Sequence, residues 1–99
     1  MSEAGGLSFA REDGASGGAY VARIDGHEAK MTFSRASERL IIIDHTEVPD
    51  ALRGRGVGDR LVRHAVEEAR SAGTKIFPLC PFAASQFRKH PEYADVLSK

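Results

Sequence analysis

The sequence predicts an α/β fold: a mixed, mostly antiparallel sheet with one parallel strand-helix-strand crossover. Two observations carry this prediction. Strand-like segments at residues 19–24 and 27–34 flank Asp25-Gly26, a dipeptide that tolerates the positive φ angles of a tight hairpin turn. Further along, an apolar segment, an amphipathic helix and a second strand follow one another, which is the order of a right-handed parallel crossover.

Length and composition predict one ordinary globular domain spanning residues 1–99. A chain of 99 residues can bury one modest core, and its 41% hydrophobic and 28% charged residues are typical of a folded protein rather than a disordered one. Fourteen basic residues balance fourteen acidic ones. The overall field therefore gives no reason to expect a nucleic-acid or membrane partner, and any anion site must be local.

The N-terminus and the cysteine content predict a cytoplasmic protein. Residues 1–6 lack the basic and apolar regions of a signal peptide and are expected to be disordered, and the single cysteine, Cys80, excludes an internal disulfide. The longest strongly apolar run, residues 40–43, is far shorter than the roughly twenty residues needed to span a bilayer. Cysteine and histidine never recur at zinc-binding spacing, so no metal is expected.

The N-terminal half is expected to supply the antiparallel strands. Residues 7–10 start the first strand, and the Gly- and Ser-rich residues 13–18 end it as a mobile loop. In the segment 27–34, Ala29, Met31 and Phe33 alternate with polar residues, so one face of that strand should be buried.

A buried strand that ends in ionisable residues is a place to look for chemistry. After a polar loop at residues 35–38, residues 40–43 are apolar at every position, as expected of a central strand that is covered on both faces. Asp44, His45, Thr46 and Glu47 follow, and Pro49 ends the strand because it cannot donate to a ladder.

The C-terminal half is expected to form the crossover and a last helix. Apolar residues recur on one helical face through residues 57–72, and Gly73 supplies a C-terminal stop. Residues 75–79 read as a strand and residues 81–89 as a helix, which residues 90–93 break. The tail 94–99 is expected to pack as a final turn or strand.

The segment 53–58 predicts an anion site. It joins a strand to a helix N-terminus, where free backbone N–H groups and the helix dipole converge on an anion, and its glycines let the backbone approach a phosphate. Asp59 also suits the positive helix end. The alternative is a Gly-rich turn with solvated arginines. The residues involved are Gly54, Gly56, Val57 and Gly58, with positive charge from Arg53, Arg55, Arg60 and Arg63.

The pattern Arg53-x-x-Gly56-x-Gly58 between a strand and an amphipathic helix resembles the acyl-CoA signature of the GCN5-related N-acetyltransferase superfamily. The likeness extends over roughly residues 7–97 and is similar to the small, minimal predicted acetyltransferases of that superfamily. Its further motifs are His45-Thr46-Glu47-Val48-Pro49, Pro78-Leu79-Cys80-Pro81-Phe82 and His90-Pro91-Glu92-Tyr93.

The resemblance implies that acetyl-CoA or coenzyme A binds as a co-substrate. The strands at residues 40–48 and 75–79 would splay to admit pantetheine, and the glycine loop would hold the pyrophosphate through its amides. Larger relatives have N-terminal helices that help to form the acceptor site. Because antiparallel strands start almost at once here, the amine acceptor site should be shallow or completed by a partner.

The same resemblance implies roles for residues of the strand end. Glu47 is the preferred general base, which removes a proton from the acceptor ammonium directly or through water. Its alternative is a solvated strand-end carboxylate. His45 either relays that proton or bonds to its own scaffold, and the backbone N–H of Val48 would polarise the thioester carbonyl.

Cys80 follows the second crossover strand, where a reacting thioester would reach it. It is either an acyl acceptor or proton donor, or a small core residue. The segment 81–89 lacks the tyrosine that many relatives use as a general acid, and Tyr93 is the nearest candidate by sequence. Phe82 is expected to be core or pocket wall.

Ser85 and Arg88 lie three residues apart on the last helix. They would contact the coenzyme from the opposite wall of the site, or else form an exposed helix face. The leading hypothesis from sequence is an N-acetyltransferase in which the amine attacks the bound thioester directly. Its rival is a CoA-binding module without turnover, with a regulatory or partner-binding role.

Overall fold

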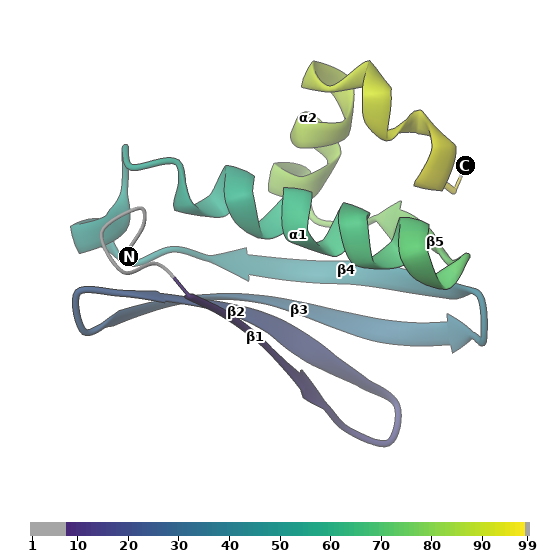
Figure 1. Cartoon of the computed structure of the whole chain (residues 1–99), viewed down its shortest axis with the longest axis horizontal. Helices are drawn as coiled ribbons and strands as arrows, with labels where there is room; N and C mark the ends of the chain where they lie inside the picture. The colour runs from purple at the N-terminus through teal and green to yellow at the C-terminus, as the bar shows by residue number, and fades with distance from the viewer. Residues whose placement is uncertain (1–7, 99) are drawn as a thin grey trace.

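Five strands form one sheet in the order β1-β2-β3-β4-β5. The computed structural model describes residues 8–98, and the expectations for residues 1–6 and for Leu7 as a strand residue lie outside that range. Neighbouring strands are antiparallel from β1 to β4, whereas β4 and β5 are parallel. The predicted mixed sheet with one parallel crossover is therefore confirmed (Figure 1). The strands are β1 (Ser8–Asp13), β2 (Gly17–Ile24), β3 (His27–Ser37), β4 (Leu40–Glu47) and β5 (Lys75–Pro78).

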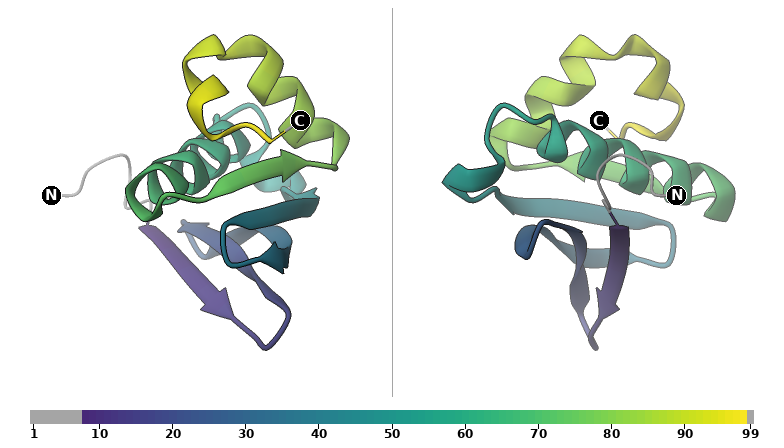
Figure 2. Two further views of the ribbon diagram at one scale, coloured as in Figure 1. Left: turned by 90° about the vertical axis from the view of Figure 1, so that its right-hand side faces the viewer. Right: turned by 60° about the vertical axis from the view of Figure 1, so that its left-hand side comes forward.

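The helices gather on one face of this sheet (Figures 1 and 2). Helix α1 (Val57–Ala72) connects β4 to β5, and α2 (Pro81–Lys89) follows β5. Both helices have the predicted bounds. Two 3-10 turns, η2 (Asp50–Leu52) and η3 (Pro91–Val96), precede α1 and follow α2. The tail ends as a turn and a bridge, since Leu97 pairs with Ile76 of β5.

Helix α1 forms because its sequence has one continuous apolar face. Leu61, Val62, Ala65, Val66 and Ala69 are all buried in the core against the sheet. Burial of each larger aliphatic side chain contributes about 1.5 to 3 kcal/mol, which outweighs the weak helix propensity of valine. The helix ends at Gly73, whose φ of 74° and N–H bond to the Ala69 carbonyl form a left-handed C-cap.

The first hairpin is longer and its loop shorter than the sequence predicts. Strand β1 continues to Asp13 and β2 begins at Gly17, so the loop is residues 14–16 rather than the expected 13–18. Glycine is needed here because of close strand contacts: a Cβ at Gly17 would overlap the Phe33 carbonyl, and one at Gly18 would overlap that of Glu12. Gly17 and Gly18, which suggested a mobile loop, are instead sites of close backbone approach.

Strand β3 also exceeds its predicted end at residue 34, because it runs to Ser37 through the expected polar loop. Its register against β4 shifts twice. One irregularity lies between Arg35 and Ser37, and the other falls where Thr32 pairs with His45 but Phe33 pairs with Ile43. At the second shift Asp44 is the extra residue of a β-bulge, which reverses the faces of the residues that follow it.

Strands β4 and β5 separate where the parallel pairing ends. The last paired residues are Ile43 and Pro78, after which both Leu79 and Cys80 donate their N–H groups to the Ile43 carbonyl. Strand β4 continues to Glu47 without a β5 partner, while the segment after β5 turns away into α2. We call this separation the fork: one branch is the end of β4, residues 44–47, and the other is the segment from Leu79 into α2.

Candidate functional site

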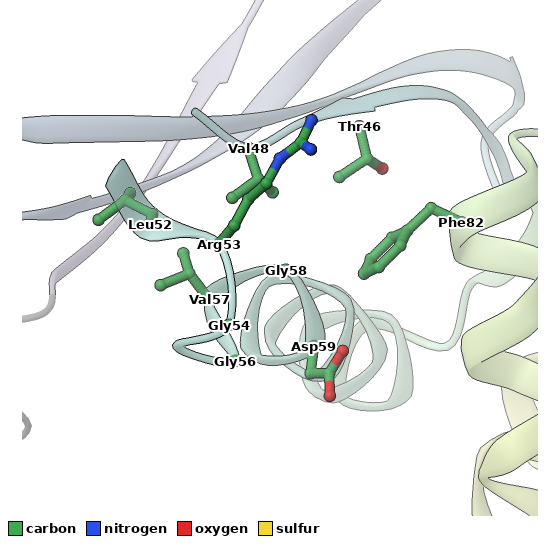
Figure 3. A pocket seen from close by; sticks show the side chains of 10 residues that line it. All are labelled: Thr46, Val48, Leu52, Arg53, Gly54, Gly56, Val57, Gly58, Asp59 and Phe82. Carbon is green, nitrogen blue, oxygen red and sulfur yellow. The ribbon is translucent and has the colours of Figure 1, made fainter. Parts of the chain in front are cut away.

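A cavity of about 600 Å³ lies between the end of β4, the N-terminus of α1 and the start of α2 (Figure 3). Its volume is within the usual range for small-molecule sites. It contains most of the residues that the sequence predicts for coenzyme binding. The lining residues are Thr46, Val48, Leu52, Arg53, Gly54, Gly56, Val57, Gly58, Asp59 and Phe82.

The glycine loop presents the free amides of α1 to this cavity. Gly54 and Gly56 have φ angles of 78° and 73°, a left-handed conformation that residues with a Cβ adopt at a cost. Gly56 is the N-cap of α1, and no side chain caps the helix there. The first N–H groups of the helix therefore remain available to an anion.

Gly58 has a different reason to be glycine. A Cβ at this position would lie 2.7 Å from Cζ of Phe82, so the phenyl ring occupies the space that a side chain would need. By contrast, no atom lies within 4 Å of a Cβ built at Gly54 or Gly56. Conformation thus explains the first two glycines, and packing of α1 against α2 explains the third.

The four arginines of this region do not converge as the sequence suggests. Arg53 lines the cavity (Figure 3). Its Nε lies 3.3 Å from Oδ1 of Asp50. Arg55 instead donates to Asp25 in the β2–β3 turn at 3.0 Å. Arg60 and Arg63 line a separate surface hollow beside β1. Positive charge at the cavity therefore rests on Arg53 and the helix dipole, opposed by the carboxylate of Asp59 on the cavity wall.

The bulge at Asp44 determines which side chains of β4 face the cavity. Thr46 pairs with buried Met31 and, with Val48, points toward the helices and lines the cavity. His45 and Glu47 pair with Thr32 and Lys30 and are exposed on the opposite face of the sheet. Asp44 also lies on that opposite face, where it accepts from the Ser34 hydroxyl at 2.7 Å, because the bulge breaks strict alternation along β4. The two candidate proton carriers, His45 and Glu47, therefore lie across the sheet from the glycine loop.

Glu47 lies in a shallow hollow of its own on that opposite face, with Glu28, Lys30 and Pro49. None of the helices in residues 8–98 covers this face (Figure 1). A carboxylate there is accessible to solvent and to a substrate that approaches the fork from the open side.

Cys80 is buried beside the cavity rather than exposed in it. Its side chain is 4% exposed, and as the N-cap of α2 its Sγ accepts from the Ala83 N–H at 3.4 Å. Its other neighbour is Thr46, whose Oγ1 lies 3.4 Å from Sγ. Sequence reasoning did not assign Thr46 a role. The strand alternation alone puts Thr46 on the same face as Val48, which was the available signal.

The remaining candidates do not reach the cavity. Ser85 donates its hydroxyl to the Phe82 carbonyl at 2.7 Å, and Arg88 is exposed on α2. Tyr93 packs in the core, stacked on His90 at a centroid distance of 4.8 Å and edge-on to Phe87 at 5.7 Å. Burial raises the pKa of Tyr93, and its ring contributes to packing rather than to the cavity wall.

Residues 8–98 contain neither a grouped set of metal ligands nor a membrane-spanning helix. Within that range no three His, Cys, Asp or Glu side chains are grouped so as to hold a metal ion. The helices of the same range also include none with the length and apolar character required to cross a membrane.

Comparison with known proteins identifies the family of this chain. Residues 19–96 match the family described as GCN5-related N-acetyl-transferase. A solved GCN5-like putative N-acetyltransferase from Staphylococcus aureus is 32% identical, with a TM-score of 0.67 over 90% of this chain and 87% of its own. An IAA acetyltransferase from Bacillus cereus is 25% identical, with a TM-score of 0.58 over 75% of this chain and 53% of its own.

Among curated proteins, the chain is similar to Protein NATD1 of Gallus gallus and of Homo sapiens. Each is 28% identical over 74 residues, which is 73% of this chain. The aligned part is about two thirds of each relative, at 67% and 66% of their lengths. The family match extends over most of the chain, and the mixed five-stranded sheet agrees with the solved neighbour, so this chain belongs to the GCN5-related N-acetyltransferase family.

Proposed function

We propose that this protein is an acetyl-CoA-dependent N-acetyltransferase, in which an amine attacks the bound thioester directly in a ternary complex. The observation that carries the proposal is the cavity, which joins an uncapped helix N-terminus to the fork between β4 and α2. Free helix amides at one end of the cavity and the apolar side chains of Val48 and Phe82 at the fork suit the two chemically different parts of coenzyme A.

The coenzyme would be held from both ends of the cavity. The N–H groups at the start of α1, with Arg53, would bind the pyrophosphate, because free amides and a guanidinium both favour phosphate oxygens. Val48 and Phe82 would contact the pantetheine in the fork, where the thioester would lie near Thr46. The backbone N–H of Val48 is our candidate donor to the thioester carbonyl.

The acceptor amine would come from the open face of the sheet. Glu47 and His45 are exposed there, and Glu47 is our candidate base for the ammonium proton. Direct attack then requires the acetyl group to be presented at the gap where β4 and β5 have separated. This route requires of the acceptor only a nucleophilic amine.

A CoA-binding module without turnover is the second candidate, and one observation favours it. The cavity wall contains Asp59 and Arg53 as its ionisable side chains, but no histidine, cysteine or tyrosine. A binding role needs no more than this, whereas catalysis needs Glu47 from the far face or a group that contacts the cavity indirectly.

Release of the CoA thiol from acetyl-CoA, measured with a panel of primary amines, tests the proposal. Steady release that depends on both substrates is the expected result. Calorimetric titration with CoA separates the two candidates, because a binding module would take up CoA yet release no thiol with any amine. Absence of CoA binding would overturn both.

A further inference from the structure

Thr46 is the polar side chain of β4 that faces the fork. Its half-buried hydroxyl lies on the cavity wall, on the β4 branch of the fork and opposite Phe82 (Figure 3). The bulge at Asp44 is what turns it there, since uninterrupted alternation from Ile41 and Ile43 would have turned His45 and Glu47 toward the helices instead.

The Thr46 hydroxyl has a partner that can exchange a proton with it. Cys80 Sγ lies 3.4 Å from Oγ1, and either atom can be the donor. The buried thiol and the hydroxyl on the cavity wall form a two-residue path along which a proton can move between the core and the cavity. Cys80 itself is 4% exposed and is absent from the wall, so it acts on a ligand only through Thr46.

The environment of Cys80 suits a sulfur that carries negative charge transiently. Its Sγ already accepts the N–H of Ala83 at the first turn of α2, and an N–H donor stabilises a thiolate more than a thiol. The positive end of the α2 dipole acts in the same direction. The carboxyl and imidazole groups of β4, on Asp44, His45 and Glu47, are exposed rather than in this contact.

We propose that Thr46 protonates the departing CoA thiolate, with Cys80 as the positioning residue that replaces the proton. This rests on the acetyl transfer proposed above. The nitrogen lone pair forms the C–N bond, and the C–S bond breaks with its electron pair left on the CoA sulfur. The Thr46 hydroxyl proton moves to that sulfur, and the Cys80 thiol proton moves to Thr46. The proton that the acceptor nitrogen has lost returns from cavity water through Thr46 to Cys80, so both residues end unchanged.

The relay allows a hydroxyl, which is a weak acid, to act as the proton donor at this point. A threonine alone is too weak an acid to lose its proton outright, but in a relay it gains one proton as it gives the other. The net transfer is then from one thiol to another thiolate, which is close to balanced in free energy. A positioned proton donor of this kind accelerates a reaction by about 100-fold or more.

Two substitutions at Thr46 test this role against simple packing. Thr46→Val keeps the shape and removes the hydroxyl, and Thr46→Ser keeps the hydroxyl. We expect kcat to fall about 100-fold in the valine variant and to stay within about 5-fold in the serine variant. The CoA dissociation constant should change less than about 3-fold in both, since the hydroxyl acts on the leaving sulfur after binding. Thr74→Val, at the far end of α1, is the matched control and should keep full turnover.

A solvent deuterium isotope effect on kcat separates proton donation from structure. We expect an effect in the wild type that disappears in Thr46→Val and is reduced in Cys80→Ala. Melting temperatures within a few degrees of wild type identify variants that are folded, and the serine variant keeps the test decisive if valine is not tolerated. Full turnover of Thr46→Val, or loss of turnover in Thr46→Ser equal to that in valine, would overturn the relay. A wild type that binds CoA but releases no thiol would overturn the transferase itself.

Discussion

Arg53 and Arg60 show how side-chain direction, rather than position in the sequence, determines the charge of a site. Both belong to the arginine-rich segment around the glycine loop, yet Arg53 lines the cavity and Arg60 lines a hollow beside β1. The sequence predicts positive charge near the glycine loop. It does not predict which guanidinium reaches the ligand, because that depends on side-chain rotamers and on partners such as Asp25, which holds Arg55.

Arg53→Gln should therefore weaken CoA binding more than Arg60→Gln does. Loss of one charge-assisted contact costs about 1.5 kcal/mol, which is roughly a 10-fold rise in the dissociation constant. The difference between the two variants should shrink at high salt because the interaction is screened. Calorimetry with CoA at low and high ionic strength makes the comparison. Equal effects in the two variants would show that the phosphates are bound elsewhere.

Glu47→Gln should slow turnover without weakening the coenzyme complex. A base is needed for the acceptor proton but not for CoA, so we expect kcat to fall at least about 10-fold while the CoA dissociation constant stays unchanged. Glu28→Gln is the control, because Glu28 lines the same hollow and already pairs with Arg23. If both variants keep the wild-type rate and pH profile, Glu47 is only a solvated carboxylate.

At the scale of elements, local patterns predicted the helices well and the strand ends poorly. The bounds of α1 and α2 follow from apolar periodicity and from stop signals such as Gly73, all of which are local. Strand ends depend on partners distant in the sequence, which is why β3 runs past its predicted end to Ser37. The bulge at Asp44 has no local signature either. It determines which candidates face the cavity, so the contents of the site were less predictable than its location.

Gly56→Val should abolish CoA binding while it leaves the fold intact. A β-branched residue strongly disfavours the left-handed φ of 73°, so the loop must rearrange and the α1 amides lose their alignment. Gly26→Val is a matched control, since Gly26 also has a positive φ, of 77°, and open space around it, but lies in the β2–β3 turn. Both should lose about 1 to 2 kcal/mol of stability in urea unfolding. Similar CoA affinity in the two variants would contradict a site at this loop.

At the scale of the molecule, Tyr20 joins the sheet to α1. Its ring is buried between Phe33 and His64, with Arg11 5.5 Å from its centroid. Burial raises the pKa of Tyr20 to about 12, against the attraction of the Arg11 charge, which lowers it. The folded protein therefore holds this phenol neutral at pH values where an unfolded chain would ionise it.

This shift predicts an alkaline loss of stability. The contribution of Tyr20 is fully present below pH 10, the ordinary pKa of tyrosine, and is lost as the pH rises from about 10 to about 12. At pH 11 the free energy of unfolding should be lower by about 1 kcal/mol than at pH 8 from this residue alone. Urea unfolding of Tyr20→Phe at both pH values isolates the contribution. A loss as large in that variant as in the wild type would assign it to other groups.

The uncovered face of the sheet has a consequence for selectivity. A substrate enclosed by walls is chosen partly by its size, because a molecule that is too large cannot enter. If the acceptor approaches beside His45 and Glu47, no helix of residues 8–98 surrounds it, and size cannot serve as the filter. A small polyamine and a lysine on the surface of a folded protein would then have equal access to the fork. Selection between them would then depend on the attraction between each acceptor and the exposed side chains around His45 and Glu47.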